Sequence, residues 1–293
     1  MNIHTGNEIE HLAVCFNAMT DELQNYMKNL TKITAEKERI ATELNVAKDI
    51  QVSMLPKDFD FDRKDFELYA TMNAAKDVGG DFYDFYLLDE NHLVITIADV
   101  SGKGIPAALF MMISKTILKN FAMTMTTPDD FSAVMTLANN QLCQNNDAMM
   151  FVTVFIGMLD LKTGEFIFVN GGHNPPLIYN NAENKFEYLK VQKNFVLGAM
   201  DDMDFEQQKI RLAKGDIIYL YTDGVTEALN KENELYGEKR LQDCLNRADK
   251  NISVNDLLKF VRADVKKHVN GADQSDDMTM LALRLMRNEE LGI

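Results

Sequence analysis

Four aspartates in widely separated segments are the residues of this chain best suited to chemistry: Asp81, Asp99, Asp223 and Asp276. Each lies beside a short β-like run or turn, and a nearby glycine permits a positive φ or a close backbone approach. No histidine or cysteine accompanies them in these motifs. Carboxylates without imidazole or thiolate suit hard cations, Mg²⁺ or Mn²⁺, rather than zinc.

The same charges explain why a cation is needed. Two carboxylates about 4 Å apart repel by about 4 kcal/mol at an effective dielectric of about 20. Two divalent ions roughly 3.5–4 Å apart reverse that sign, lower the pKa of a water held between them and neutralise phosphoryl oxygens. The pattern therefore predicts a site for hard divalent cations that could bind a water and neutralise phosphoryl oxygens.

The elements around Asp99 are those that would hold such a carboxylate rigidly. The β-branched run Val94–Ile97 is typical of a buried strand, and it leads directly to Asp99. A glycine turn follows, and Pro106 near the start of the apolar run 105–113 predicts a helix there. An aspartate that only caps the turn is the alternative interpretation of this segment.

Five motifs follow one another in an order that resembles a known family. They are Gly-Gly-Asp-Phe-Tyr-Asp (79–84), Ala-Asp-Val-Ser-Gly-Lys-Gly (98–104), Asn-Gly-Gly-His-Asn-Pro-Pro (170–176), Tyr-Thr-Asp-Gly-Val-Thr-Glu (221–227) and Asp-Asp-Met-Thr (276–279). From roughly Ile50 to Leu283 the chain resembles the PPM-type (protein phosphatase 2C-like) serine/threonine phosphatases of the SpoIIE/RsbU group. The resemblance implies an α+β fold, a four-layer α-β-β-α sandwich, with two Mn(II) or Mg(II) ions per active site. It also implies a phosphoserine or phosphothreonine substrate, often a STAS-type anti-sigma-factor antagonist.

The resemblance also assigns roles to residues. Asp99 would bridge both ions, Asp81 would hold one of them, and Asp223 with Asp276 would hold the other. Val100 would add its backbone carbonyl. Asp84 and Asp277 match less firmly, as residues behind the ligands or near a further ion.

Two departures from the wider protein phosphatase 2C family leave roles unassigned. Ser101 stands where that family has a histidine, and the family's arginine-bearing phosphate-binding segment is not evident. Water and Lys103 are weak candidates for the leaving-group acid and the phosphate anchor. His173 is a further candidate acid, although a histidine in such a Gly-Pro-rich loop more often braces the turn.

Residues 1–55 predict one long helix. Its apolar positions alternate in steps of three and four, as in a coiled-coil seam, with only Lys37 and Gln51 clearly polar. We expect a parallel homodimer, with Leu30, Ile33, Ile40 and Leu44 in the regulatory linker; a single helix packed on its own domain is the alternative. The full seam is Phe16, Met19, Leu23, Tyr26, Leu30, Ile33, Lys37, Ile40, Leu44, Ala47, Gln51 and Met54.

The chain divides into three predicted parts. Residues 1–20 resemble the second helix of a HAMP signalling linker, residues 21–55 form the coiled-coil linker, and residues 56–293 form the phosphatase domain. Because the first HAMP helix is missing, we expect a piece of a longer, membrane-anchored sensor. A change in helix pairing could then reach the metal site, since the helix runs directly into the domain.

The hydrophobic period and the turn residues predict the strands and helices of the domain. Strands are predicted at 68–72, 85–88, 93–97, 151–159, 165–169, 176–179, 186–191, 216–221 and 278–283. Helices are predicted at 105–123, 131–145, 237–247 and 254–269. Strands in runs with helices grouped between them favour α+β layers over a regular βαβ array.

Composition excludes several classes. A net charge of −15 over 293 residues argues against a nucleic-acid binder and against a polybasic membrane segment. Three widely spaced cysteines predict reduced thiols and a cytoplasmic location, and no apolar run reaches the length of a membrane span.

Other functions fit the motifs less well. A tyrosine-phosphatase Cys-x5-Arg is absent, Gly102-Lys103 is not a Walker loop, and Gly79-Gly80-Asp81 continues into aromatic residues unlike a cyclic-dinucleotide synthase. The alternative from another class is a catalytically weak signalling scaffold of the same fold that binds a partner protein. An intact set of four aspartates favours the enzyme, because a scaffold has no use for them.

Overall fold

The computed structural model describes residues 6, 8–125, 131–192, 194–249 and 251–286, and it divides into two compact units that meet between Ile50 and Gln51. The first unit consists of most of helix α1, Glu8–Met54. Its seam is open to solvent: Phe16, Leu23 and Ile33 are 59%, 54% and 53% exposed. Among the described residues, no helix combines the length and apolarity that crossing a membrane requires.

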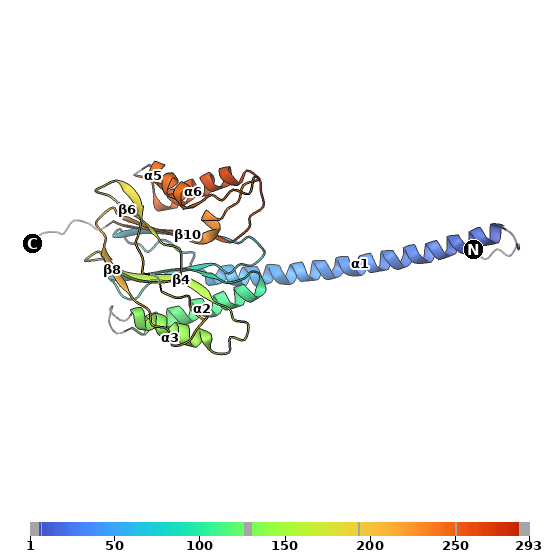
Figure 1. Ribbon diagram of the computed structural model, residues 1–293, viewed down its shortest axis with the longest axis horizontal. Coiled ribbons are helices and arrows are strands. Elements are labelled where there is room, and N and C mark those ends of the chain that lie inside the picture. Colours follow the sequence, from blue (N-terminus) through green and yellow to red (C-terminus); the bar gives the residue numbers. More distant parts are fainter. Residues whose placement is uncertain (1–5, 7, 126–130, 193, 250, 287–293) are drawn as a thin grey trace, which may run out of the picture. The chain divides into compact units, whose positions relative to one another are not determined.

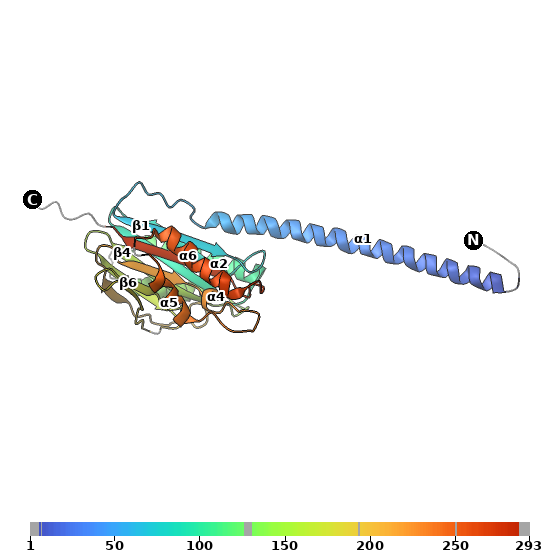
Figure 2. The ribbon, with the colours of Figure 1, turned by 90° about the horizontal axis from the view of Figure 1, so that it is seen from above.

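The second unit is built on two five-stranded antiparallel sheets (Figures 1 and 2). One sheet has the order β1-β10-β9-β6-β7, formed by Phe66–Asn73, Met278–Leu285, Ile217–Tyr221, Leu177–Asn180 and Lys185–Tyr188. The other has the order β2-β3-β4-β5-β8, formed by Phe82–Leu87, His92–Val100, Val152–Asp160, Glu165–Gly171 and Gln208–Arg211.

Helices cover the outer face of each sheet, so the unit has the layers α-β-β-α (Figure 1). Helices α5 (Glu238–Arg247) and α6 (Val254–Val269) pack on the first sheet, and α2 (Ile105–Met123) and α3 (Phe131–Cys143) pack on the second. A one-turn helix, α4 (Asp223–Thr226), follows β9. The predicted α+β four-layer sandwich with a long N-terminal helix is confirmed.

Two buried clusters fill the spaces between these layers. The larger includes the stacked rings of Phe155, Phe166 and Phe168, with centroids 5.2–6.3 Å apart. The smaller lies between the first sheet and α5 and α6. Burying strands on both faces fixes the strand register, and the register places the strand ends where the aspartates lie.

Most predicted elements are present, with shifted ends. Helices α2 and α6 have the predicted bounds, while β2 begins three residues before the prediction. Strand β8 and helix α4 were not predicted, since β8 (Gln-Lys-Ile-Arg) is mostly polar and α4 is a single turn, too short for a helical period. Asp223, predicted in a turn after a strand, is the first residue of α4.

Candidate metal centre

The four predicted aspartates lie at one end of the sandwich, although they come from both sheets. Asp81 directly precedes β2, and Asp99 is the last residue but one of β3. Asp223 follows β9, and Asp276 lies just before β10. Because β10 contacts both β2 and β3 across the sandwich, these strand ends are neighbours. Their charges interact, Asp99 with Asp81, Asp223 and Asp276 in particular.

Asp81 is buried and is oriented by a hydroxyl. The Thr222 hydroxyl donates to Asp81 Oδ2 at 2.7 Å and accepts from the Thr279 backbone N–H at 2.9 Å. Asp81 is 1% exposed, and both threonines are fully buried. Sequence reasoning missed Thr222; its place beside Asp223 in the Tyr-Thr-Asp-Gly motif was the available signal.

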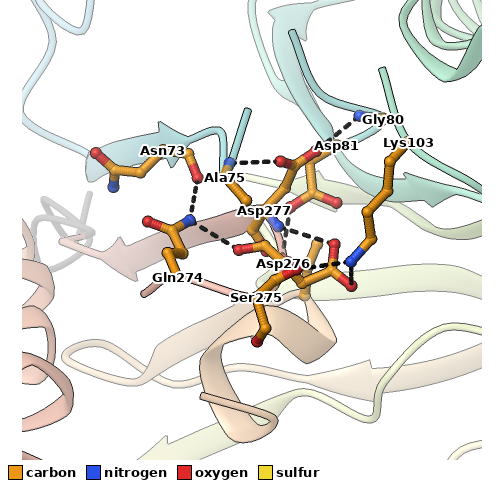
Figure 3. Close-up of polar contacts among 10 residues, drawn as sticks. Asn73, Ala75, Gly80, Asp81, Lys103, Gln274, Ser275, Asp276 and Asp277 are labelled. Carbon is orange, nitrogen blue, oxygen red and sulfur yellow. Dashed lines mark hydrogen bonds and ion pairs between the residues drawn. The ribbon is translucent and has the colours of Figure 1, made fainter. Parts of the chain in front are cut away.

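Asp277 fastens the loop that carries Asp81 (Figure 3). Its Oδ1 accepts from the Ala75 N–H at 2.8 Å, and its Oδ2 accepts from the Gly80 N–H at 2.7 Å. A Cβ at Gly79 would overlap this carboxylate, so the loop requires glycine there. Asp277 therefore acts on the cluster by positioning the loop that carries Asp81.

Asp276 is paired with a cation. Lys103 Nζ lies 2.7 Å from Asp276 Oδ2 and donates to the Ser275 carbonyl, also at 2.7 Å (Figure 3). This pairing raises the pKa of Lys103. The lysine of the glycine turn thus lies at the acidic cluster, which makes it the nearest identified cation for a phosphate group.

Burial and mutual repulsion make the carboxylates reluctant to ionise together. Burial, with the Asp99 charge next, raises the pKa of Asp81 well above its usual range. Burial, and then Asp223, raises the pKa of Asp99 to about 7. Burial, followed by Glu227 and Asp276, raises the pKa of Asp223 to about 6. A bound cation would therefore stabilise the ionised form of these carboxylates and lower their pKa values.

The chemistry of this donor set fits hard dications. The oxygen donors are carboxylates, and the Val100 carbonyl lies close to Gly80, within 2.8 Å of where a Cβ would be. In the described ranges, no three His, Cys, Asp or Glu side chains already converge as a ready ligand set. Asp276 would release Lys103 to bind an ion, whereas the Thr222 hydroxyl occupies only Oδ2 of Asp81 and leaves that carboxylate oriented.

Comparison with known proteins also indicates a phosphatase family. The family model "Stage II sporulation protein E (SpoIIE)" matches residues 89–286, more than half of the chain. The chain belongs to the SpoIIE family. This confirms the PPM-type phosphatase group that the motifs predicted, and with it the class of protein serine/threonine phosphatases.

Individual proteins similar to this SpoIIE-family chain support the same family. It is 32% identical to the phosphoserine phosphatase RsbU of Bacillus subtilis over 84% of this chain and 71% of RsbU. It is 29% identical to protein IcfG of Synechocystis sp. over 97% of this chain, and it spans about half (48%) of IcfG. The solved SiaA-PP2C domain of Pseudomonas aeruginosa has the same fold, with a TM-score of 0.72 at 20% identity over 85% of this chain and 98% of that domain.

Asp84 does not join the cluster of this SpoIIE-family domain. It is buried on β2 and pairs with Lys115 Nζ of α2 at 2.6 Å, with Lys119 Nζ at 3.8 Å. These contacts do not involve the four aspartates, and the expected role of Asp84 behind the metal ligands stays a prediction.

His173 braces its loop. Its backbone N–H donates to Asn170 Oδ1 at 2.7 Å, the Asn170 amide donates to the His173 carbonyl at 2.9 Å, and Nδ1 lies 2.8 Å from the Thr153 hydroxyl. Burial lowers the pKa of His173 to about 4, so the ring is neutral near pH 7. These contacts favour the structural interpretation over a general acid.

Gln51 makes a contact that the heptad pattern did not predict. It is 2% exposed within the second unit, where its amide donates to the Gly79 carbonyl at 2.6 Å and accepts from the Gly79 N–H at 3.1 Å. The seam prediction is wrong at this position, because the side chain is already engaged. The last turn of α1 thus holds the same loop that Asp277 holds at Ala75 and Gly80.

Proposed function

We propose that this chain hydrolyses phosphoserine or phosphothreonine on a protein substrate, using water and two Mn(II) or Mg(II) ions. The carrying observation is that Asp81, Asp99, Asp223 and Asp276 lie at strand ends on one end of the sandwich and that their charges interact, with raised pKa values in three of them. Membership of the SpoIIE family supports the reaction class.

The four aspartates and the Val100 carbonyl would hold the ions. When bound, the ions supply a water of lowered pKa and offset the charge that develops on the phosphoryl oxygens. Asp99 lies between Asp81 and Asp223 in the network of charges, which suits it to contact both ions. Thr222 and Asp277 keep Asp81 and its loop in place.

Lys103 is our candidate for the phosphate anchor. Its ammonium group has only carboxylate and carbonyl partners in the cluster, and Asp276 would exchange Lys103 for an ion on metal binding. The released lysine would then face a site with an incoming dianion. No described residue at the cluster stands out as the leaving-group acid, so we assign that proton to water.

The substrate and assembly belong to the same proposal. RsbU and RsbP of Bacillus subtilis are named phosphoserine phosphatases, which supports a phosphorylated protein partner, for which we propose a STAS-type antagonist. We propose a homodimer through α1, whose apolar seam is exposed in the single chain. The free cysteines Cys15, Cys143 and Cys244 agree with action in the cytoplasm.

The test is phosphate release from a phosphorylated STAS-domain protein, with p-nitrophenyl phosphate as a generic substrate. We expect manganese-dependent release from both, and a loss of at least 100-fold in Asp99→Ala and Asp223→Ala. The matched control is Asp243→Ala, an exposed acid on α5 that should retain full activity. Phosphate release that survives Asp99→Ala would contradict the proposal.

A further inference from the structure

A groove of about 550 Å³ lies between α6, the one-turn helix α4 and the loop before β10. Its floor is apolar, formed by the buried Val225 and Met280 and the half-buried Met278, and its lining also includes the small residues Ala263 and Ala272. We call this the α6 groove. Its size and apolar floor suit one or two side chains of a ligand.

The lining of the groove includes chain neighbours of two aspartates of the acidic cluster. Gly224 and Ser275 line it, and they adjoin Asp223 and Asp276 in the chain. Gln274, also in the lining, donates from Nε2 to the Asp276 carbonyl at 2.7 Å and to the Asn73 carbonyl at 2.9 Å (Figure 3). A chain segment with its phosphate at the cluster could therefore continue into the groove.

The wall formed by α6 is cationic. Lys259, Arg262 and Lys266 all line the groove, spaced so that they share one face of the helix. They extend over about 10 Å of helix axis, the length of about three extended residues. The only acid in this lining is Asp273. In a chain of net charge −15, such a wall is a local exception.

Two of these cations keep their charge available. Lys259 is paired with Asp256 at 2.9 Å. Arg262 instead donates to the neutral Asn73 side chain at 2.8 Å, and within the described ranges no carboxylate pairs with Arg262 or Lys266. Exposed cations without anionic partners next to an apolar floor suit a ligand that carries both acids and an apolar side chain.

We propose that the α6 groove binds the segment of the substrate protein that flanks the phosphorylated residue, and that this segment is acidic with at least one large apolar side chain. The inference rests on the proposed phosphatase function and adds the class of sequence that the site selects. Arg262 and Lys266 act in recognition, and the acidic cluster performs the reaction.

The test measures the hydrolysis of two phosphoserine peptides by the 293-residue chain in the presence of manganese. One peptide carries glutamates and a leucine on both sides of the phosphoserine, and the other has lysines and alanine at those positions. We expect kcat/KM to be at least 10-fold higher for the acidic peptide. In the double variant Arg262→Glu, Lys266→Glu that preference should disappear, while hydrolysis of p-nitrophenyl phosphate stays within about twofold of wild type.

Two further variants make the result specific. Ala263→Trp fills the groove without a change of charge and should weaken the acidic peptide through KM. Lys185→Glu with Lys209→Glu, on β7 and β8, makes the same charge change elsewhere and should leave the preference intact.

Four outcomes would overturn the inference. They are no peptide preference in wild type, an equal loss in the β7 and β8 control, an equal loss of aryl phosphate hydrolysis in the groove variant, and a changed oligomeric state showing that a second copy fills the groove. A wild-type protein that hydrolyses neither peptide nor aryl phosphate would instead refute the proposed function itself.

Discussion

At the scale of residues, the cluster is a set of acids whose folded environment opposes their charge. Burial and like charges raise the pKa of Asp99 to about 7 and that of Asp223 to about 6. The residue types and their chemistry were predictable from the sequence, because each aspartate lies in a recognisable motif. Their hydrogen-bond partners were not, since Thr222 and Thr279 meet only through the pairing of β9 with β10.

The raised pKa of Asp99 predicts how the metal-free protein responds to pH. A carboxyl whose folded pKa exceeds its unfolded pKa binds its proton more tightly when folded, so the contribution of Asp99 to stability is fully present below about pH 4 and is lost as the pH rises through about 7. In chelator, we expect the free energy of unfolding of Asp99→Asn relative to that of wild type to increase by about 1–3 kcal/mol from pH 5 to pH 8, because only wild type is destabilised as Asp99 ionises. Partial solvent exposure of Asp99 keeps the figure below the full shift.

Denaturant unfolding at the two pH values measures this difference. Asp243→Asn removes an exposed charge on α5 that does not act on the pKa of Asp81, Asp99 or Asp223, so it should follow wild type. Saturating Mn²⁺ should abolish the penalty in wild type. Parallel pH profiles for wild type and Asp99→Asn would show that the carboxyl is not destabilised by its surroundings.

Thr222→Val should be costly although it conserves shape. The change leaves Asp81 Oδ2 without its donor and the Thr279 N–H without its acceptor, both buried. We expect a loss of about 1–3 kcal/mol in stability, a higher manganese concentration for half-maximal activity, and recovery of both in Thr222→Ser. Equal behaviour of the valine and serine variants would rule out a role for the hydroxyl.

At the scale of elements, the loop 75–80 connects three parts of the domain. Asp277, just before β10, holds it at Ala75 and Gly80, while Gln51 from the last turn of α1 holds it at Gly79. The helix itself was predictable from its heptads, and so was its end close to residue 55, since α1 ends at Met54. The heptad count could not reveal that Gln51 faces the domain, because a period of 3.5 describes a seam and not what occupies it.

This double attachment predicts that Gln51→Leu loosens the loop beside Asp81. Leucine cannot replace either bond to the Gly79 backbone, so we expect manganese binding to weaken several-fold with kcat at saturating metal largely retained. Gln24→Leu, an exposed position on the same helix, is the matched control and should leave manganese binding unchanged. Titration of activity with Mn²⁺ distinguishes the two, and equal metal affinity in both variants would separate α1 from the site.

At the scale of the whole molecule, one long helix with an exposed apolar stripe precedes an intact phosphatase fold. The sandwich could be predicted because the motifs that resemble the family lie at strand ends, where the hydrophobic pattern also predicts that strands begin or end. Strand β8 and helix α4 could not, and neither could the α6 groove, because its walls come from segments joined only by the fold. The predicted division at 20 and 55 stays a prediction.

The dimer hypothesis makes a separate prediction about α1. Deleting residues 1–45, or introducing Leu30→Asp with Ile33→Asp, should convert a dimer to a monomer and change activity, since the seam is lost but Gln51 is kept. Lys28→Asp, off the seam, should leave both unaltered. Light scattering with parallel activity measurements tests this, and an unchanged mass in the seam variants would refute the coiled coil.

The central claim is that four aspartates from distant parts of the chain jointly bind the ions on which hydrolysis depends. Its most direct test is the amount of Mn²⁺ bound per chain, measured together with phosphate release in wild type and in Asp99→Asn, with folding verified by circular dichroism. The account predicts two bound ions in wild type and the loss of both binding and phosphate release in the variant. A folded Asp99→Asn protein that binds manganese and releases phosphate as wild type does would contradict it.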